Sequence, residues 1–161
     1  FPGFPLMLRG RIDRVDSLGE HKYRIIDYKT GGYSHFGKMR YFGGGRILQH
    51  ALYSLAAEVI LKKTGRDDKA RVVESGYYFP TRRGEGKEII VRDFDRDDFK
   101  ALVVELLRIL LKGQFVVNPE ADCRFCDYVP ICGAGAVNRV KEKRGANPEE
   151  FGIFDRLKEY E

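Results

Sequence analysis

Apolar and polar residues alternate in four short segments of the chain, and apolar residues recur at helical spacing in two longer ones. Alternation favours half-buried strands, whereas apolar positions three and four residues apart favour amphipathic helices. The predicted strands cover residues 5–16, 22–29, 71–80 and 87–94, and the predicted helices cover residues 47–63 and about 96–112. The order strand, strand, helix, strand, strand, helix fits an α/β fold with helices packed on the faces of a sheet.

The segments between these elements carry turn residues and no clear period. A polar turn, SLGEHK, links the first two strands, and the glycine-rich stretch 31–46 predicts a mobile loop. Gly113 ends the second helix, and a loop with proline and three cysteines follows over residues 118–133. The remaining C-terminal residues are charged and predict two short helices. We therefore expect one domain, with a core over residues 1–117 and a cysteine-containing extension over residues 118–161.

Composition supports a globular chain. It has 161 residues, of which 43% are hydrophobic, so it can bury a core of its own. The longest apolar stretch, ALVVELLRILL, contains Glu105 and Arg108 and predicts an amphipathic helix, not a membrane span. The formal net charge of +5 permits a polyanionic partner, although a modestly basic soluble domain is common. We expect a cytoplasmic protein without a membrane partner.

Two acidic residues and a lysine lie in the first predicted hairpin, RGRIDRVDSLGEHKYRIIDYKTGG. If the turn is centred on Glu20, Asp13 lies opposite Asp27, and Lys29 shares a face with Asp27. Opposed carboxylates either raise a pKa or bind a cation, and hard oxygen ligands predict Mg²⁺ or Mn²⁺. The alternative is a surface hairpin held by weak salt bridges. The apolar neighbours in RIIDYK favour burial, and a buried acid needs a partner.

These three residue types together predict hydrolytic chemistry. A metal held by two carboxylates lowers the pKa of a bound water and polarises a phosphoryl oxygen. A neighbouring lysine orients the nucleophile or stabilises charge in the transition state. The hairpin therefore predicts a site that hydrolyses phosphodiesters.

The stretch GRIDRVD followed by IIDYKTGG closely resembles the nuclease domain of the PD-(D/E)XK superfamily, in its AddB/RecB branch. That branch is the nuclease of helicase–nuclease machines that process double-strand breaks. The resemblance implies a restriction-endonuclease-like core, with a mixed central sheet flanked by helices. It implies metal ligation by Asp13, Asp27 and the backbone carbonyl of Tyr28, and it implies a catalytic lysine at Lys29.

The resemblance extends to the next predicted helix, where QHALY supplies Gln49 and Tyr53. These two residues lie on one helix face and are similar to the pair that contacts DNA and supports the site in that branch. Taken alone, Gln49 could equally be a surface amide and Tyr53 a core aromatic residue. Arg14 and Asp16 also match the DRxD part of the motif, without an assigned role.

One residue of the family pattern has no counterpart in the chain. The family usually carries a histidine on a helix before the first strand, and His21, His35 and His50 lie in other places. The first residues, FPGFPLMLRG, include no initiator Met and no signal-peptide layout. We expect the chain to begin inside a larger protein and to be of low or no activity on its own.

All three cysteines lie in CRFCDYVPIC, as Cys123, Cys126 and Cys132. This clustering predicts metal ligation, but three thiolates complete neither a tetrahedral zinc site nor a four-iron cluster. The resemblance to iron–sulfur nucleases of the AddB type implies a [4Fe–4S] cluster whose fourth cysteine lies upstream of Phe1. Zinc with a further ligand and three reduced thiols are the alternatives.

The sequence also offers residues that could contact DNA. In the loop 31–46, basic residues could bind phosphates and aromatic residues could stack on bases. The candidates there are Lys38, Arg40, Arg46, Tyr33, Phe36, Tyr41 and Phe42, and the turn between the last two strands adds Arg82 and Arg83. The alternative is that these residues are solvated loop charges.

The sequence thus predicts a Mg²⁺-dependent deoxyribonuclease domain, an exonuclease of double-strand-break processing and recombinational repair. Its expected partners are DNA and a helicase subunit or helicase domain. A CRISPR-associated adaptation nuclease shares the fold and the cysteine pattern and is the rival within the enzyme class. The rival outside it is a non-catalytic DNA-binding or scaffold domain held by the iron–sulfur cluster.

Overall fold

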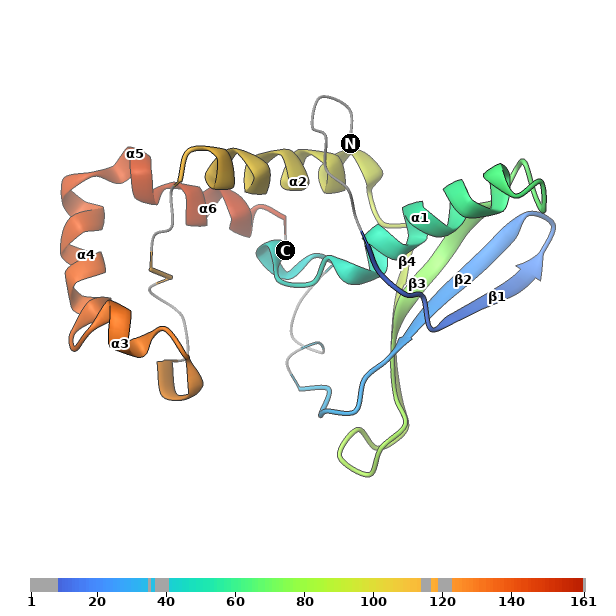
Figure 1. The fold of residues 1–161 in the computed structure, drawn as a ribbon, viewed down its shortest axis with the longest axis horizontal. Helices are drawn as coiled ribbons and strands as arrows, with labels where there is room; N and C mark the ends of the chain where they lie inside the picture. The colour runs from blue at the N-terminus through green and yellow to red at the C-terminus, as the bar shows by residue number, and fades with distance from the viewer. Residues whose placement is uncertain (1–8, 35, 37–40, 114–116, 119–122, 161) are drawn as a thin grey trace. The chain divides into compact units, whose positions relative to one another are not determined.

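The computed structural model describes residues 9–34, 36, 41–113, 117–118 and 123–160 (Figure 1). The chain divides into two compact units. The first unit comprises Phe1–Tyr41 and Ile47–Asp95, and the second comprises Phe42–Arg46 and Arg96–Glu161. None of the helices in the described residues is long and apolar enough to cross a membrane.

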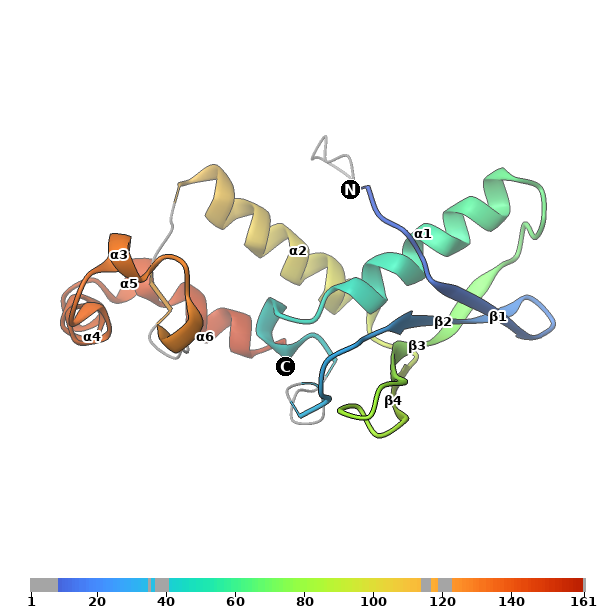
Figure 2. The same cartoon turned by 60° about the horizontal axis from the view of Figure 1, so that its bottom comes forward.

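The first unit is built on a four-stranded mixed sheet. Its strands are β1 (Arg14–Gly19), β2 (Lys22–Tyr28), β3 (Arg71–Phe79) and β4 (Lys87–Arg92), and they lie in the order β1-β2-β3-β4. The β1–β2 and β3–β4 pairs are antiparallel, whereas β2 and β3 run parallel. A parallel pair needs a crossover, and helix α1 (Gln49–Lys63) supplies it (Figure 2). The predicted α/β fold class is confirmed.

The first hairpin is tighter than the sequence predicted. Its first strand begins at Arg14 and continues to Gly19, and Gly19 pairs with Lys22, so the turn holds only Glu20 and His21. The predicted strand over residues 5–16 was therefore placed too early, and its residues 5–8 lie outside the described part of the chain. Gly19 has φ of +118°, a conformation that favours glycine and that lets the chain reverse this sharply. The pairing Arg14 with Ile26 keeps the register predicted from a turn at Glu20.

Helix α1 covers one face of the sheet. Ile25, Val72 and Ala57 form a buried cluster there, with Tyr53 packed against it. These residues come from β2, β3 and α1, as expected if period two on the strands and period 3.6 on the helix point to one core. The structure thereby fixes α1 against the strand that carries Asp27.

Two aromatic residues of the glycine-rich stretch, which was predicted to be a mobile loop, join a second cluster on the sheet. Tyr33 and Phe36 pack against Tyr77 and Phe79, with ring centroids 4.6 Å apart for Phe36 and Tyr77. These contacts tie the half-buried rings to the sheet, because aromatic rings remove a large apolar area from water when they pack. Residues 35 and 37–40 of this stretch lie outside the description.

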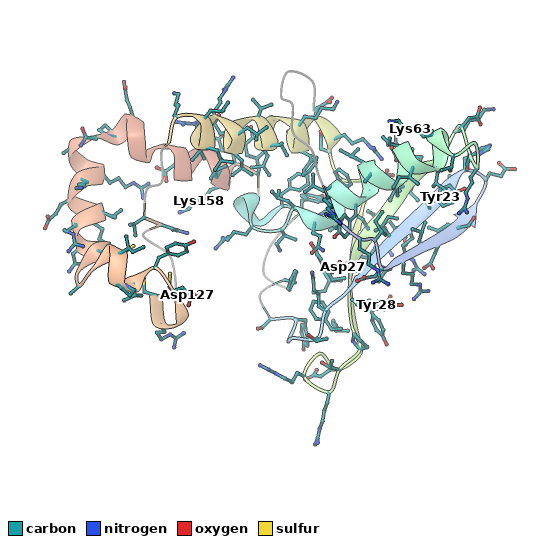
Figure 3. The ribbon with its side chains drawn as sticks, in the orientation of Figure 1. Tyr23, Asp27, Tyr28, Lys63, Asp127 and Lys158 are labelled. Carbon is teal, nitrogen blue, oxygen red and sulfur yellow. The ribbon has the colours of Figure 1, made fainter. Side chains whose placement is uncertain are left out.

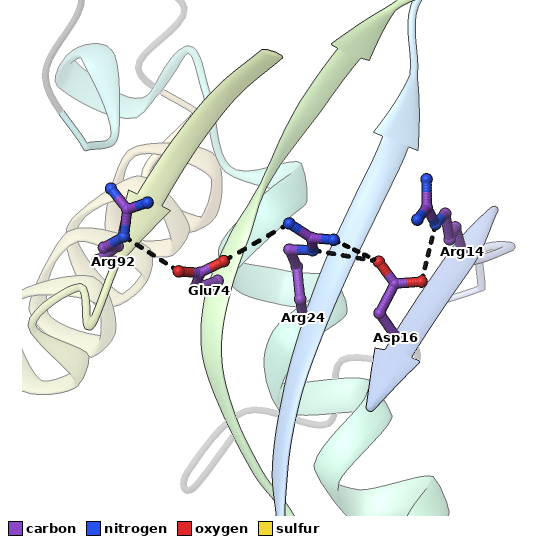
Figure 4. Close-up of polar contacts among 5 residues, drawn as sticks. All are labelled: Arg14, Asp16, Arg24, Glu74 and Arg92. Carbon is purple, nitrogen blue, oxygen red and sulfur yellow. Dashed lines mark hydrogen bonds and ion pairs between the residues drawn. The ribbon is translucent and has the colours of Figure 1, made fainter. Parts of the chain in front are cut away.

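The opposite face of the sheet carries a chain of ion pairs that crosses all four strands (Figure 4). Asp16 contacts Arg14 at 2.8 Å and Arg24 at 3.0 Å, and Glu74 contacts Arg24 at 3.8 Å and Arg92 at 3.0 Å. The Arg14 guanidinium holds the pKa of Asp16 below its usual value, with Arg24 adding to the effect. We call these five residues the charge ladder. It gives the Arg14 and Asp16 of the DRxD match a structural role.

The second unit is mostly helical. Its elements are η1 (Gly43–Gly45), α2 (Arg96–Leu111), η2 (Cys123–Phe125), α3 (Val129–Cys132), α4 (Ala136–Ala146), α5 (Pro148–Phe151) and α6 (Ile153–Lys158). Phe42 and Phe99 pack with centroids 5.3 Å apart, and Glu105 of α2 contacts Arg156 of α6 at 2.9 Å. The two short C-terminal helices predicted from the sequence are thus three, α4 to α6, because Asn147–Pro148 and Gly152 interrupt the helical run.

Candidate active site

The candidate site lies where β2 ends beside the start of α1. Asp27 and Lys29 share the face of β2 that α1 covers, because side chains alternate along a strand, and Figure 3 shows the end of the strand at Asp27 and Tyr28. Asp27 is 4% exposed. Lys29 follows the last strand residue, and its backbone N–H continues the sheet by donating to the Tyr78 carbonyl at 2.9 Å. The lysine is therefore held by sheet hydrogen bonding although it lies beyond β2.

One glutamine connects the charged groups of this site. The Gln49 amide nitrogen donates to Asp27 Oδ1 at 2.9 Å and contacts the Tyr53 hydroxyl at 3.1 Å. Its amide oxygen accepts a hydrogen bond from Lys29 Nζ at 2.6 Å. Gln49 and Tyr53 lie one helical turn apart on α1 and so reach the same place. Gln49 is therefore not a surface amide, whereas Tyr53 packs against the core cluster and also reaches Gln49 through its hydroxyl.

Lys29 also lies 2.6 Å from Asp27 Oδ2, as an ion pair. The geometry is not that of a hydrogen bond, and Oδ2 is a buried oxygen without a hydrogen-bond partner among the described residues. At 2.6 Å the electrostatic attraction between the ammonium and the buried carboxylate is strong. Asp27 is thus held by Lys29 at one oxygen and by Gln49 at the other.

Asp13 lies beside this group, directly before β1. It extends the β1–β2 register by one pair, since Arg14 faces Ile26. Its Oδ2 accepts a hydrogen bond from the Tyr28 backbone N–H at 3.0 Å, and the residue is exposed. The second carboxylate is therefore open to solvent at the same strand end as Asp27.

The oxygen atoms at this strand end fit a hard divalent cation. Mg²⁺ commonly uses one or two protein carboxylates and keeps several waters. Asp13, Asp27 and the Tyr28 carbonyl supply such oxygens, and Asp27 Oδ2 makes no hydrogen bond within the described residues other than its ion pair with Lys29. Across the residues that the structure describes, no group of three or more His, Cys, Asp or Glu side chains could hold a metal ion. A metal here would therefore rest on two carboxylates, a backbone oxygen and water.

Tyr77 adds an aromatic wall that the sequence did not indicate. It pairs with Asp27 in the parallel β2–β3 register, and its ring centroid lies 5.3 Å from Lys29 Nζ. Burial raises the pKa of Tyr77, so the phenol stays neutral. A cation over an aromatic face is favoured by the ring quadrupole. Only the parallel pairing, which joins residues 50 positions apart, brings this residue to the site.

His50 lies in the core of the first unit and not at the site surface. Its Nδ1 lies 3.0 Å from the Ser75 hydroxyl, and its Nε2 lies 2.8 Å from the Tyr41 carbonyl. The carbonyl can only accept, so Nε2 carries the proton and Nδ1 accepts from Ser75. Burial lowers the pKa of His50, which keeps the ring neutral.

The structure buries one of the residues predicted to contact DNA. Phe42 is 2% exposed in the second unit, so the prediction that it stacks on bases is wrong. Tyr33 and Phe36 are half-buried and pack on the sheet. Tyr41 is 48% exposed. Arg46 is exposed and donates to the Gly43 carbonyl at 3.0 Å. Lys38 and Arg40 lie outside the described residues.

The three cysteines are free thiols in the second unit. Cys123 is exposed, whereas Cys126 and Cys132 are half-buried. They lie around η2 and α3, but they are not drawn together into a group that could hold a metal ion. Within the described part of the chain the three thiols therefore do not form a cluster site.

Comparison with known proteins identifies one family. The family model described as the PD-(D/E)XK nuclease superfamily matches residues 2–133, which is more than half of the chain. The match includes every candidate site residue named above and all three cysteines. No curated protein and no solved structure matches the chain.

Proposed function

Because the chain belongs to the PD-(D/E)XK nuclease superfamily, we propose that it hydrolyses the phosphodiester backbone of DNA at the end of β2. The observation that carries the proposal is the bonding of Gln49, which contacts an acid, a lysine and a tyrosine at once. A structural salt bridge between Asp27 and Lys29 would not require a third residue to orient both partners. A site that must hold a cationic amine at a fixed point does require one.

In this proposal Asp13, Asp27 and the carbonyl of Tyr28 hold Mg²⁺ or Mn²⁺. When bound, the metal supplies Lewis-acid polarisation of the phosphoryl oxygen and a water of lowered pKa. Gln49 holds Asp27 Oδ1 at 2.9 Å and Lys29 holds Oδ2 at 2.6 Å, so the carboxylate is fixed at the strand end where the metal would bind. Asp13 is fixed by the Tyr28 backbone N–H at 3.0 Å.

Lys29 in this proposal assists hydrolysis as a positioned cation. Its Nζ is held by Gln49 and Asp27, both at 2.6 Å, and lies over the Tyr77 ring. A preorganised donor of this kind stabilises negative charge that develops on the phosphate, and needs little reorganisation during reaction. Gln49 and Tyr53 act as positioning residues. The Gln49 amide sets where Lys29 points, and the Tyr53 hydroxyl helps to fix the amide.

Tyr53 is itself located by the chain that leads into the site. A Cβ atom on Gly10 would lie 3.1 Å from the Tyr53 ring, so the glycine lets the backbone approach the ring closely. Gly10 belongs to the GRID segment that also brings Asp13. The same short segment therefore supplies one carboxylate and packs against the tyrosine that supports the other.

We further propose that the domain is an exonuclease of the AddB/RecB branch, cytoplasmic, that works with a helicase in double-strand-break processing and repair. The DYKTGG segment, the Gln-x-x-x-Tyr spacing and the downstream cysteines support this assignment. A CRISPR-associated adaptation nuclease is the alternative within the enzyme class. A non-catalytic DNA-binding or scaffold domain is the alternative outside it, and the bonding of Lys29 argues against it.

The cysteines are proposed to hold a [4Fe–4S] cluster with a structural role. A cluster takes four thiolates, and the sequence contains Cys123, Cys126 and Cys132, so a further ligand is required. An anaerobic preparation of the protein tests this. Brown colour with iron–sulfur absorption supports the cluster, whereas bound zinc or metal-free thiols contradict it.

The nuclease proposal is tested by degradation of linear single-stranded DNA, with Mg²⁺ and with EDTA. We expect Lys29→Ala to lose activity by at least about 100-fold, the loss typical when one preorganised charge-stabilising donor is removed. DNA binding in EDTA should remain. Lys63→Ala is the matched control, because Lys63 is exposed at the far end of α1 (Figure 3). If wild type binds DNA but cuts none with Mg²⁺ or with Mn²⁺ in its place, the catalytic role is refuted.

A further inference from the structure

The connection between β3 and β4 projects beyond the strand ends on the side of the candidate site (Figure 1). It runs from Pro80 to Gly86 and carries two adjacent arginines, Arg82 and Arg83, in an exposed position. We propose that this Arg82–Arg83 tip binds backbone phosphates of the DNA strand that occupies the site. The proposal rests on the proposed nuclease function and adds a second contact point for its substrate.

The tip is joined to the segment that follows Lys29. The Thr81 hydroxyl donates to the Thr30 carbonyl at 3.1 Å, directly after the lysine. Further along, the Tyr33 hydroxyl contacts Glu85 at 3.3 Å, and Lys87 Nζ lies 6.0 Å from the Tyr33 ring centroid. The two loops therefore support each other, and the tip is placed relative to the lysine by direct contacts.

The turn itself has a defined backbone. The Gly84 and Glu85 N–H groups both donate to the Thr81 carbonyl at 2.9 Å. A Cβ atom on Gly84 would lie 2.4 Å from Phe79 Cβ, so the chain folds back closely on the end of β3. A fixed turn lowers the conformational entropy that binding would otherwise remove from the backbone. The arginines are thus presented from an ordered base.

The charges of the tip are available to a ligand. The arginines on the sheet, Arg24 and Arg92 among them, are bound to acids in the charge ladder. In contrast, Arg82 and Arg83 form none of the ion pairs found among the described residues. Glu85, the acid of the turn, accepts a hydrogen bond from the Tyr33 hydroxyl and keeps its negative charge. Within the described residues the tip therefore presents two arginines that are not ion-paired, beside one acid.

The spacing suits a nucleic-acid strand. Tyr78 bonds the backbone of Lys29, and Arg82 is four residues further on, which spans at most about 14 Å of extended chain. A strand whose phosphate lies at Lys29 would therefore place a phosphate a few nucleotides away beside the tip. Arginine presents a planar fork that matches phosphate oxygens in pairs, whereas phosphate contacts position a strand without reading its sequence.

The test compares Arg82→Ala/Arg83→Ala with Lys62→Ala/Lys63→Ala, which removes the same charge at the far end of α1. Binding of a fluorescein-labelled single-stranded oligonucleotide is measured by anisotropy in EDTA between 50 and 200 mM salt. Two lost phosphate contacts make the slope of log affinity against log salt shallower by about 1.4. The deficit of the tip variant should then grow about sevenfold over this range as salt is lowered. Lys62→Ala/Lys63→Ala should change the salt slope and the affinity much less than the tip variant does.

If both double variants lose the same affinity and show the same salt slope, the proposed role of the Arg82–Arg83 tip is refuted, because the change in net charge alone would then explain the loss of affinity. Degradation of DNA by wild type in Mg²⁺, assayed in parallel, would leave the nuclease proposal standing in that case. If wild type neither binds nor degrades DNA, both proposals fall. Thermal melting checks folding, and Arg82→Gln/Arg83→Gln, which keeps side-chain length, replaces the alanine variant if that one melts early.

Discussion

Loss of Lys29 should destabilise the fold more than loss of its acidic partner. Asp27 is 4% exposed, and its carboxylate is balanced by Lys29 at 2.6 Å and by the Gln49 amide at 2.9 Å. Lys29→Met leaves the buried carboxylate with the amide alone. Removing one partner of a fully buried pair costs about 3–5 kcal/mol. The lysine side chain is 28% exposed, which reduces the expected cost to about 1–3 kcal/mol.

The reciprocal change should cost less. Asp27→Asn removes the buried charge and retains a side chain of the same shape, while Lys29 can turn toward solvent. We expect a loss of less than about 1 kcal/mol, and we expect the double variant to be more stable than Lys29→Met alone. Thermal melting without divalent metal measures the difference, at roughly 2–4 °C per kcal/mol for a chain of this size. Lys63→Met serves as the exposed control.

Two outcomes would refute this reasoning. If Lys29→Met has the same melting temperature as wild type, the buried Asp27 carboxylate does not depend on the lysine for stability. If the effects of the two single changes simply add in the double variant, the groups do not interact, and the 2.6 Å contact carries no coupling energy.

Three further predictions concern the backbone, the pH response and the metal. Gly76→Ala should abolish folding, because the added Cβ would lie 2.0 Å from the Ile89 carbonyl oxygen. The control Gly145→Ala, which adds a Cβ in open space on α4, should fold normally. Soluble yield and far-UV circular dichroism measure both outcomes. Burial lowers the pKa of His50 in the folded state, so below about pH 6.5 the unfolded chain binds a proton that the folded chain does not. The free energy of unfolding therefore falls as the pH drops below about 6.5, by up to about 1.4 kcal/mol per pH unit. His50→Gln should melt with a smaller decrease between pH 7 and pH 5, and equal decreases in both proteins would exclude His50 as the cause. Mg²⁺ at about 100 times its dissociation constant should stabilise wild type by about 2.7 kcal/mol. Asp27→Asn should lose this gain, and an equal melting shift in that variant would place the metal elsewhere.

The local pattern of apolar and polar residues predicted much of the fold. The alternation around Asp27 and the helical spacing after Leu48 predicted β2 and α1 within two residues of their observed bounds. The turn at Glu20 also predicted the register that places Asp13 beside β2. These features depend on residues close in sequence, and such residues produce a periodic pattern of apolar positions from which the element can be predicted.

Long-range pairing was not predictable from the same pattern. The position of Tyr77 next to Asp27 follows from a parallel register, and the charge ladder joins residues from all four strands. Nothing in the local sequence around Arg24 or Glu74 indicates which acid or base it will meet. Likewise, Phe36 sits among glycines without any period, so its burial on the sheet depends on the space left by Tyr77 and Phe79.

The charge ladder ties the pairing register of β2 to both stability and activity. Arg24 and Asp27 belong to one strand but project to opposite faces, one into the ladder and one into the site. A slip of β2 by one residue would exchange these faces. It would set Arg24 against apolar core residues and would remove Asp27 from Gln49 in the same step. A misregistered molecule would therefore be both unstable and inert, so the folded population should contain few species with intermediate activity.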